Sequence, residues 1–164
     1  MRTTAIMIKK HFYSWADIEK MCVSIVNQMY ADNWRPDYIV GITRGGLIPA
    51  VLMSHYTGIK MHTLDVRLRD GDHDCETNTW MAEDAGNGRK ILVLDDINDT
   101  GETFKWIKQD WEGSVVNDIA WGNDVRFAAI IDNIPSEMDV EYSSMEINKM
   151  EDPSWIVFPF EEWW

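Results

Sequence analysis

The apolar residues of the chain recur with two different spacings. Between Trp15 and Met29 they return every third or fourth position, which predicts an amphipathic helix. Residues 14–17 have the pattern of a capping box, so we expect the helix to begin there and to end near residues 32–33. Residues 38–42 form a short continuous apolar run instead, which is typical of a buried strand.

The two patterns alternate along the rest of the chain. Helical spacing predicts helices from Leu47 to Tyr56 and from Phe104 to Trp111. Apolar runs predict further strands at residues 61–66, 91–94, 127–131 and 142–147. Because strands alternate with helices, we expect an α/β fold in which helices flank a parallel sheet and the crossovers are right-handed.

Two internal segments do not follow this alternation. Residues 67–88 begin with a polar stretch and end in the glycine-containing sequence Ala-Gly-Asn-Gly. We interpret them as a long mobile loop, of the kind that often forms a lid over a site. Residues 111–124 show no clear periodicity. The last ten residues, 155–164, are aromatic and acidic, and they end in Trp163 and Trp164.

Composition and charge narrow the possible functions. The 164 residues fit one domain, and two cysteines cannot form a disulfide framework. The apolar runs are far shorter than the roughly 20 residues of a membrane span, and the N-terminus leads into no signal core. We therefore expect a cytoplasmic protein. The formal charge of -13 argues against nucleic acid as a partner, although backbone amides and a divalent cation can still bind a small phosphorylated substrate.

Residues 91–103 carry the strongest functional signal. Their four leading apolar residues predict a strand that delivers Asp95 and Asp96 to the carboxyl edge of the sheet, where open α/β sheets bind ligands. A predicted helix begins near residues 100–103, and its unpaired amides suit a phosphate. The carboxylates suit sugar hydroxyls or Mg²⁺. The segment therefore predicts a sugar-phosphate site, with a plain strand–turn–helix as the alternative.

The same segment, Ile91-Leu92-Val93-Leu94-Asp95-Asp96-Ile97-Asn98-Asp99-Thr100-Gly101-Glu102-Thr103, resembles the phosphoribosyl pyrophosphate signature of type I phosphoribosyltransferases. Residues 40–49 resemble the pyrophosphate loop of the bacterial xanthine-guanine members, and residues 152–161 resemble their base-binding segment. Order and spacing agree over roughly residues 12–164, apart from an insertion near 111–124.

The resemblance implies a fold and a reaction. The chain would be a single phosphoribosyltransferase domain over residues 1–164, with a core over about 14–147 and a small hood over about 148–164. It would transfer a phosphoribosyl group from phosphoribosyl pyrophosphate to a nucleobase, a purine in the similar members, in nucleotide salvage. The implied cofactor is Mg²⁺, and the implied assembly is a homo-oligomer. We expect neither a nucleic-acid nor a membrane partner.

The resemblance also implies roles for individual residues. Asp95 and Asp96 would hold the ribose hydroxyls, directly or through Mg²⁺, and Asp99 would exchange a proton with the base. The phosphate groups would be bound by Thr43, Arg44, Gly45, Thr100, Gly101, Glu102 and Thr103. The base would be bound by Asn133, Trp155, Ile156 and Phe160, with the Trp155 indole as a stacking platform or, alternatively, as a packing residue. In the 6-oxopurine members the pyrophosphate loop carries a cis peptide, which would fall between Thr43 and Arg44.

One departure from the family pattern concerns the base. The 6-oxopurine members carry a lysine after the strand that matches residues 127–131, whereas the matching positions here hold Asp132, Asn133 and Ile134. Asn133 can donate an uncharged hydrogen bond, and Asp132 can accept one from an amino group. This leaves the base open, and the nearest lysine is Lys149. The alternative function is a regulator, or a degenerate relative of the fold, that binds phosphoribosyl pyrophosphate without catalysis.

Overall fold

The structure, a computed structural model, describes residues 7–68, 74–75 and 78–161. Its largest part is a six-stranded sheet in the order β4-β3-β2-β5-β6-β7. The strands are β2 (Tyr38–Thr43), β3 (Lys60–Arg67), β4 (Asp74–Cys75), β5 (Ile91–Asn98), β6 (Val125–Asn133) and β7 (Tyr142–Ile147). All neighbours in this sheet are parallel except β3 and β4, which are antiparallel.

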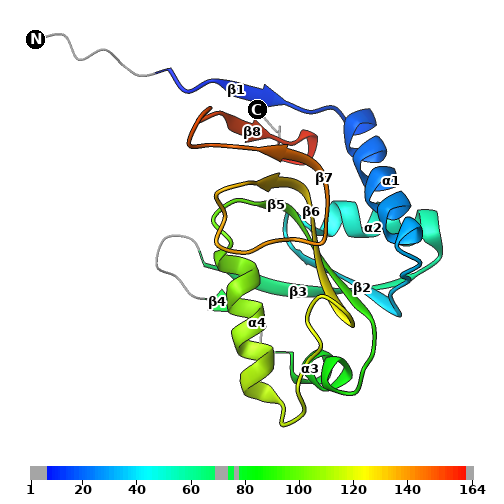
Figure 1. Ribbon diagram of the computed structural model, residues 1–164. Helices are drawn as coiled ribbons and strands as arrows, with labels where there is room; N and C mark the ends of the chain where they lie inside the picture. Colours follow the sequence, from blue (N-terminus) through cyan, green and yellow to red (C-terminus); the bar gives the residue numbers. More distant parts are fainter. Residues whose placement is uncertain (1–6, 69–73, 76–77, 162–164) are drawn as a thin grey trace, which may run out of the picture.

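Helices cover both faces of the sheet (Figure 1). On one face lie α1 (Trp15–Ala31) and α2 (Leu47–Thr57), and on the other lie α3 (Thr79–Gly86) and α4 (Glu102–Ser114). Successive side chains of a strand point to opposite faces, so Ile39 joins the core formed with α1 while Val40 joins the core formed with α4. The α/β fold predicted from the alternating patterns is confirmed.

The first helix begins as its sequence predicts. Ser14 Oγ accepts a hydrogen bond from the Asp17 amide at 3.0 Å, and the Asp17 carboxylate accepts one from the Ser14 amide at 2.8 Å. Each side chain thus satisfies an amide that the helix leaves unpaired. The side chain of Ile18 and those that follow it at helical spacing are buried against the sheet. None of the helices within the described ranges is both long and apolar enough to cross a membrane.

The segment predicted to be a long loop contains a helix. Within residues 67–88, α3 covers Thr79–Gly86, and its Met81, Ala82 and Ala85 side chains are buried against the sheet. These three apolar residues are too few to produce a sustained helical spacing in a polar segment, so the sequence does not predict α3. They are enough to pack the two turns of α3 against β2 and α4. The predicted loop also contains the short strand β4, which pairs with β3, while its residues 69–73 and 76–77 lie outside the described residues.

The segment without periodicity, residues 111–124, is ordered by aromatic packing. α4 continues through Trp111 to Ser114, and the buried Trp111 ring stacks on Trp121 with their centroids 6.1 Å apart. Trp121 in turn stacks on Phe127 of β6 at 5.6 Å, and its Nε1 donates to Glu112 at 2.8 Å. The Trp111 and Trp121 rings therefore pack the part of the segment that follows α4 against the sheet.

A two-stranded parallel sheet joins the two ends of the chain. β1 (Lys10–Phe12) pairs with β8 (Trp155–Val157), and a 3₁₀ turn at Pro159–Glu161 follows. Figure 1 shows this pair above the edge at which β5 and β6 end. We call β1, β8 and the 3₁₀ turn the hood. The sequence predicts a hood only from residues 148–164, because three exposed residues near the N-terminus carry no strand pattern.

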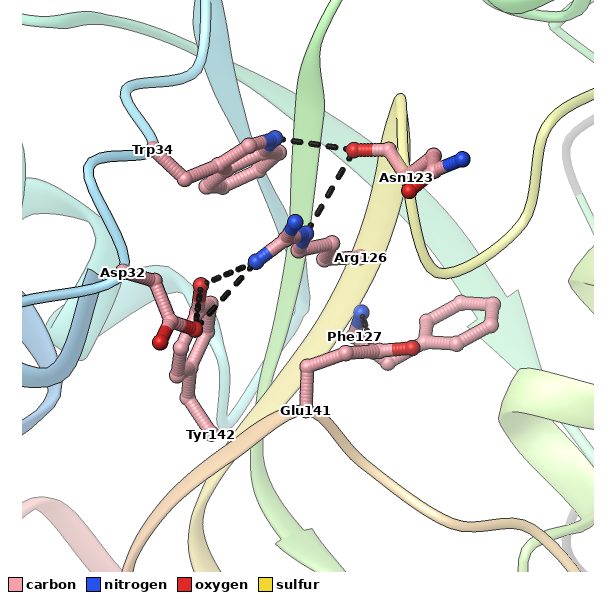
Figure 2. A network of polar contacts seen from close by, with 7 residues as sticks. All are labelled: Asp32, Trp34, Asn123, Arg126, Phe127, Glu141 and Tyr142. Carbon is pink, nitrogen blue, oxygen red and sulfur yellow. Dashed lines mark hydrogen bonds and ion pairs between the residues drawn. The ribbon is translucent and has the colours of Figure 1, made fainter.

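At the opposite end of β6, an arginine joins four segments (Figure 2). The Arg126 guanidinium lies over the Trp34 ring, 4.8 Å from its centroid, and donates to the Tyr142 hydroxyl at 2.6 Å. It also donates to Asp32 at 3.3 Å, at the end of α1, and to the Asn123 carbonyl at 3.4 Å. We refer to these residues as the Arg126 network. It ties α1 and the loop before β2 to β6 and β7.

Candidate functional site

The two adjacent carboxylates lie inside β5 rather than after it. The strand continues past the predicted end at residue 94 to Asn98, and Asp95 and Asp96 are half-buried. Asp95 Oδ1 accepts a hydrogen bond from the Asp96 amide, and Asp96 Oδ1 accepts one from the Ile97 amide, both at 2.8 Å. These short local bonds orient both side chains near the carboxyl end of the strand, which is the edge predicted from the sequence.

A tight turn connects β5 to α4. Gly101 has a φ of 89°, in the left-handed region, and a Cβ there would lie 2.7 Å from both the Met138 amide nitrogen and Ser136 Oγ. The turn is pinned by a bond of 2.9 Å from the Glu137 amide to the Thr100 carbonyl. Position 101 therefore needs glycine for both conformation and space. Gly101 offers no capping side chain, and the Glu102 amide donates to the neighbouring Thr100 hydroxyl at 3.3 Å, so the start of α4 combines backbone amides and a hydroxyl of the kind that bind an anion.

A second loop, after β2, lies against these carboxylates. Thr43 ends the strand, the Thr43–Arg44 peptide is cis, and Gly45 and Gly46 lead into α2. A side chain on Gly45 would run into the Asp96 carboxylate, so this loop is in contact with the end of β5. The cis bond falls where the family resemblance implies it. Gly46 is packed against the Leu94 carbonyl, which leaves no room for a Cβ.

The Thr43 side chain is fixed by β3. Its hydroxyl donates to Asp65 Oδ1 at 2.9 Å, and Arg67 Nε donates to the same oxygen at 3.0 Å. The Arg67 side chain is more than half exposed and Arg44 is exposed, so two guanidinium groups stand beside this loop. In a chain with a formal charge of -13, these two groups place positive charge beside this loop.

Asp99 is bonded to two other residues at the sheet edge. Lys149 Nζ lies 2.8 Å from Asp99 Oδ2. The buried Asn133 amide donates to the Asp99 carbonyl at 2.9 Å and lies 3.4 Å from Asp99 Oδ1. Asn133 Oδ1 accepts from the Lys149 backbone amide at 3.0 Å. Asn133 thus bridges the two charged residues, and we call the three the Asp99 cluster.

Asp132, the neighbouring acid, is engaged elsewhere. Its carboxylate accepts from Asn98 Nδ2 at 2.8 Å, and the same amide group donates to the Met138 carbonyl at 2.7 Å. Burial raises the pKa of Asp132, and the Asn98 bond opposes part of that rise. This arrangement holds residues 136–138 against the turn that carries Gly101.

The predicted aromatic base-binding residues lie in the hood. Trp155 is 53% exposed and its backbone amide donates to the Lys9 carbonyl at 2.8 Å. Ile156 is buried in the core shared with α1. Phe160 stacks on Phe158 with centroids 5.2 Å apart and also contacts the Trp15 ring. An exposed indole is consistent with a stacking platform, whereas the other two side chains contribute mainly to hood packing.

The structure thus brings together three predicted groups and adds a residue that the sequence analysis missed. Gly45 contacts Asp96, and Asn133 contacts Asp99. The added residue is Lys149, which the sequence analysis names only as the nearest lysine and which lies in the predicted hood, just before the base-binding segment. The available signal was the parallel pairing of β6 and β7, in which Asn133 aligns with Ile147, so that residues just after β7 reach the same edge.

Comparison with known proteins gives a consistent result. A family model described as phosphoribosyl transferase domain matches residues 7–163. Among curated proteins, xanthine phosphoribosyltransferase 1 of Saccharomyces cerevisiae is 25% identical over 130 residues, which is 65% of this chain and 62% of the yeast protein. The chain therefore spans less than two thirds of the length of this relative.

Solved structures share the fold at lower identity. A purine phosphoribosyltransferase from Pyrococcus horikoshii aligns with a TM-score of 0.69 and 21% identity, covering 95% of this chain and 96% of that one. The Helicobacter pylori xanthine-guanine-hypoxanthine phosphoribosyltransferase aligns with a TM-score of 0.70 and 16% identity, covering 95% of each chain.

Proposed function

The chain belongs to the family of phosphoribosyl transferase domains, and from this premise we propose that it transfers a phosphoribosyl group from phosphoribosyl pyrophosphate to a purine base in nucleotide salvage. The products would be a nucleotide and pyrophosphate. The observation that carries the proposal is the contact between the loop after β2 and the end of β5 at one sheet edge. Gly45 of the loop after β2 lies against Asp96 of β5, and the glycine-led start of α4 follows five residues later.

The sugar phosphate is assigned to β5 and the turn after it. The Asp95 and Asp96 carboxylates can accept hydrogen bonds from the two ribose hydroxyls. The 5′-phosphate would be bound by the amides and hydroxyls of residues 100–103, because a helix N-terminus concentrates amide donors and positive potential. The left-handed Gly101 supports this assignment, since it lets the backbone approach an anion closely.

The pyrophosphate is assigned to the loop after β2. The backbone of Thr43, the Arg44 guanidinium and the amide of Gly45 would bind the pyrophosphate as it leaves the ribose. The Thr43 hydroxyl already donates to Asp65, which holds the loop in place. Arg67, bonded to the same carboxylate, supplies a second positive charge nearby.

The residues at this edge fit a magnesium ion. Mg²⁺ prefers oxygen ligands and is usually bound by one or two carboxylates together with substrate phosphates. Asp95 and Asp96 would hold it, directly or through water. When bound, the ion neutralises phosphate charge and stabilises the departing pyrophosphate.

Asp99 is assigned the proton transfer. As a ring nitrogen of the base bonds to the anomeric carbon, the bond from that carbon to pyrophosphate breaks, and the base loses a proton from another ring nitrogen. The Asp99 carboxylate, partly exposed and held by the buried Asn133, is positioned to accept that proton. Trp155 would stack on the ring of the base, with the backbones of Ile156 and Phe160 at the ring edge.

The first experiment measures pyrophosphate release from phosphoribosyl pyrophosphate and Mg²⁺, with separate purine and pyrimidine bases. We expect release that requires both the ion and a purine. Asp96→Asn should abolish most of it, whereas Asp118→Asn, at an exposed position on the loop after α4, should leave it unchanged. Binding of phosphoribosyl pyrophosphate that depends on Mg²⁺, without release with any base, would instead indicate a regulator or a degenerate relative of the fold.

A further inference from the structure

Lys149 and Asp99 present opposite hydrogen-bonding character side by side. Lys149 Nζ lies 2.8 Å from Asp99 Oδ2, and the two side chains are 26% and 43% exposed. An ammonium group has three donors, and within the described part of the chain this one uses a single donor, on Asp99. The carboxylate retains acceptor capacity, because its other oxygen has only a long contact of 3.4 Å from Asn133. A ligand can therefore meet both groups.

The pair is held in place by a buried amide. Asn133 is 6% exposed, and both polar atoms of its side chain are used within the cluster. Its Nδ2 fixes the Asp99 backbone carbonyl at 2.9 Å, and its Oδ1 fixes the Lys149 backbone amide at 3.0 Å. One side chain thereby sets the position of both backbones. Preorganisation of this kind is what a recognition site needs and what a fortuitous surface ion pair lacks.

The polar groups at the end of β6 are not equally available to a base. Asn133 is committed to Asp99 and Lys149, and Asp132 accepts from Asn98. Of these three side chains, Lys149, on the turn after β7, therefore keeps donors for a base. The same turn continues directly into β8, which carries the exposed Trp155.

The chemistry of a donor next to an acceptor selects one kind of ring edge. A 6-oxopurine in its N7–H form presents N7–H and the carbonyl O6 on neighbouring positions, so that Asp99 can accept from N7 while Lys149 donates to O6. A 6-aminopurine presents an amino group in place of O6, and two donors would then face each other with no acceptor between them.

We propose that Lys149 is a specificity-determining residue that donates to the exocyclic oxygen of a 6-oxopurine while Asp99 accepts the neighbouring N–H. This inference rests on the proposed function, since it places the base of the transfer reaction on the Asp99 cluster. It assigns oxygen recognition to the turn after β7, not to the end of β6.

The test compares hypoxanthine with adenine in the wild type and in Lys149→Met. We expect the wild type to prefer hypoxanthine, and we expect the variant to lose about tenfold to a hundredfold in kcat/KM for hypoxanthine, because a hydrogen bond from a charged donor is removed. The value for adenine should not fall, and KM for phosphoribosyl pyrophosphate should stay within about twofold. Lys149→Arg, which keeps a cationic donor, should restore part of the preference.

The matched control is Lys9→Met. Lys9, just before β1, pairs with Asp152, which lies on the same turn as Lys149. The two charged atoms are 3.8 Å apart, and both side chains are well exposed. The control should change neither the preference nor either kcat/KM. Equal losses for hypoxanthine and adenine in Lys149→Met would show that Lys149 only holds the turn, and would overturn the proposal. So would a wild type that uses both bases equally well.

Direct binding separates this inference from the proposed function. If the wild type releases no pyrophosphate with any base, the proposed transfer is wrong, and titration of hypoxanthine and adenine in the presence of Mg²⁺ and phosphoribosyl pyrophosphate decides the role of Lys149. Tighter hypoxanthine binding that disappears in Lys149→Met would support the assignment. Equal affinity for the two bases, or none for hypoxanthine, would overturn it.

Discussion

The two ends of β6 carry two clusters that contain similar groups. They differ in how many hydrogen bonds the cation makes and in how exposed it is. The Arg126 network at the start of the strand combines a cation, a carboxylate and an amide carbonyl, and so does the Asp99 cluster at its end. The Arg126 side chain is 17% exposed, uses donors toward Asp32, Asn123 and Tyr142, and covers the Trp34 ring (Figure 2). Lys149 has one such bond and is more open to solvent.

The difference separates a structural cluster from one that can bind a ligand. The Arg126 guanidinium is 17% exposed, makes three hydrogen bonds and lies on a ring, so it is poorly accessible to a substrate, and removing it breaks contacts between four segments. An ammonium with one partner at the carboxyl end of a parallel sheet still has donors to offer, at the edge where such sheets bind ligands. We therefore expect substitutions at the start of β6 to change stability, and substitutions at its end to change chemistry.

The largest expected effect is that of Asp99→Asn on turnover. Asparagine can still accept from Lys149 but cannot take a proton at neutral pH, so kcat should fall by about 1,000-fold. Affinity for phosphoribosyl pyrophosphate should stay within a few fold, as measured by equilibrium binding. Asp32→Asn in the Arg126 network is the matched substitution and should leave kcat unchanged. Equal losses of turnover and affinity in Asp99→Asn would remove its proton-transfer role.

Arg126→Met is expected to lower stability and to leave activity unchanged. Losing the bonds to Tyr142 and Asn123 and the contact with Trp34 should lower the free energy of unfolding by about 2–3 kcal/mol. The cost stays below that of a fully buried pair because Asp32 is 56% exposed and can be rehydrated. Urea denaturation measures the loss, and kcat/KM per folded molecule should match the wild type. A stable variant with reduced activity would contradict the division between the two ends.

Tryptophans extend the comparison to the base site. Trp155→Ala should raise KM for the base by about tenfold, because an aromatic ring stacked on a base contributes about 1–3 kcal/mol, while the melting temperature changes little at an exposed position. Trp34 is 4% exposed beneath Arg126, so Trp34→Ala should lower the melting temperature and leave KM for the base unchanged. If Trp155→Ala lowers only the melting temperature, its side chain is a packing residue of the hood.

The sequence predicted the parts of this molecule that depend on local pattern. The capping box at Ser14, the buried run at residues 91–94 and the glycine-led turn at 101 all appear where expected, because each is specified by neighbouring residues. β1 was missed for the opposite reason. It is three exposed residues whose strand structure comes from pairing with β8, more than a hundred residues away.

The candidate site divides in the same way. The carboxylates and the phosphate turn lie in one continuous motif, so the sequence analysis could group them. Lys149 reaches Asp99 only because β7 is a parallel neighbour of β6, a fact that no spacing in the chain reveals. The amide of Asn133 could be recognised as a donor, but its commitment to both Asp99 and Lys149 depends on tertiary structure.

The smallest expected effect is a pH dependence near the Arg126 network. Burial raises the pKa of Glu141, against opposing hydrogen bonds that include one from the Phe127 amide at 2.6 Å. A raised pKa in the folded state means that this state binds the proton more tightly than the unfolded chain does. The stability that Glu141 contributes is thus fully present below the ordinary glutamate pKa and is lost as pH rises through the raised value.

Glu141→Gln, which can still accept from the Phe127 amide, should flatten the fall in the urea midpoint over this window. Asp132, whose pKa is also raised by burial, should retain its part of the fall, so Asp132→Asn in the same background should remove more of it. An identical pH profile for Glu141→Gln and the wild type would show that Glu141 is as well solvated in the folded state as in the unfolded chain.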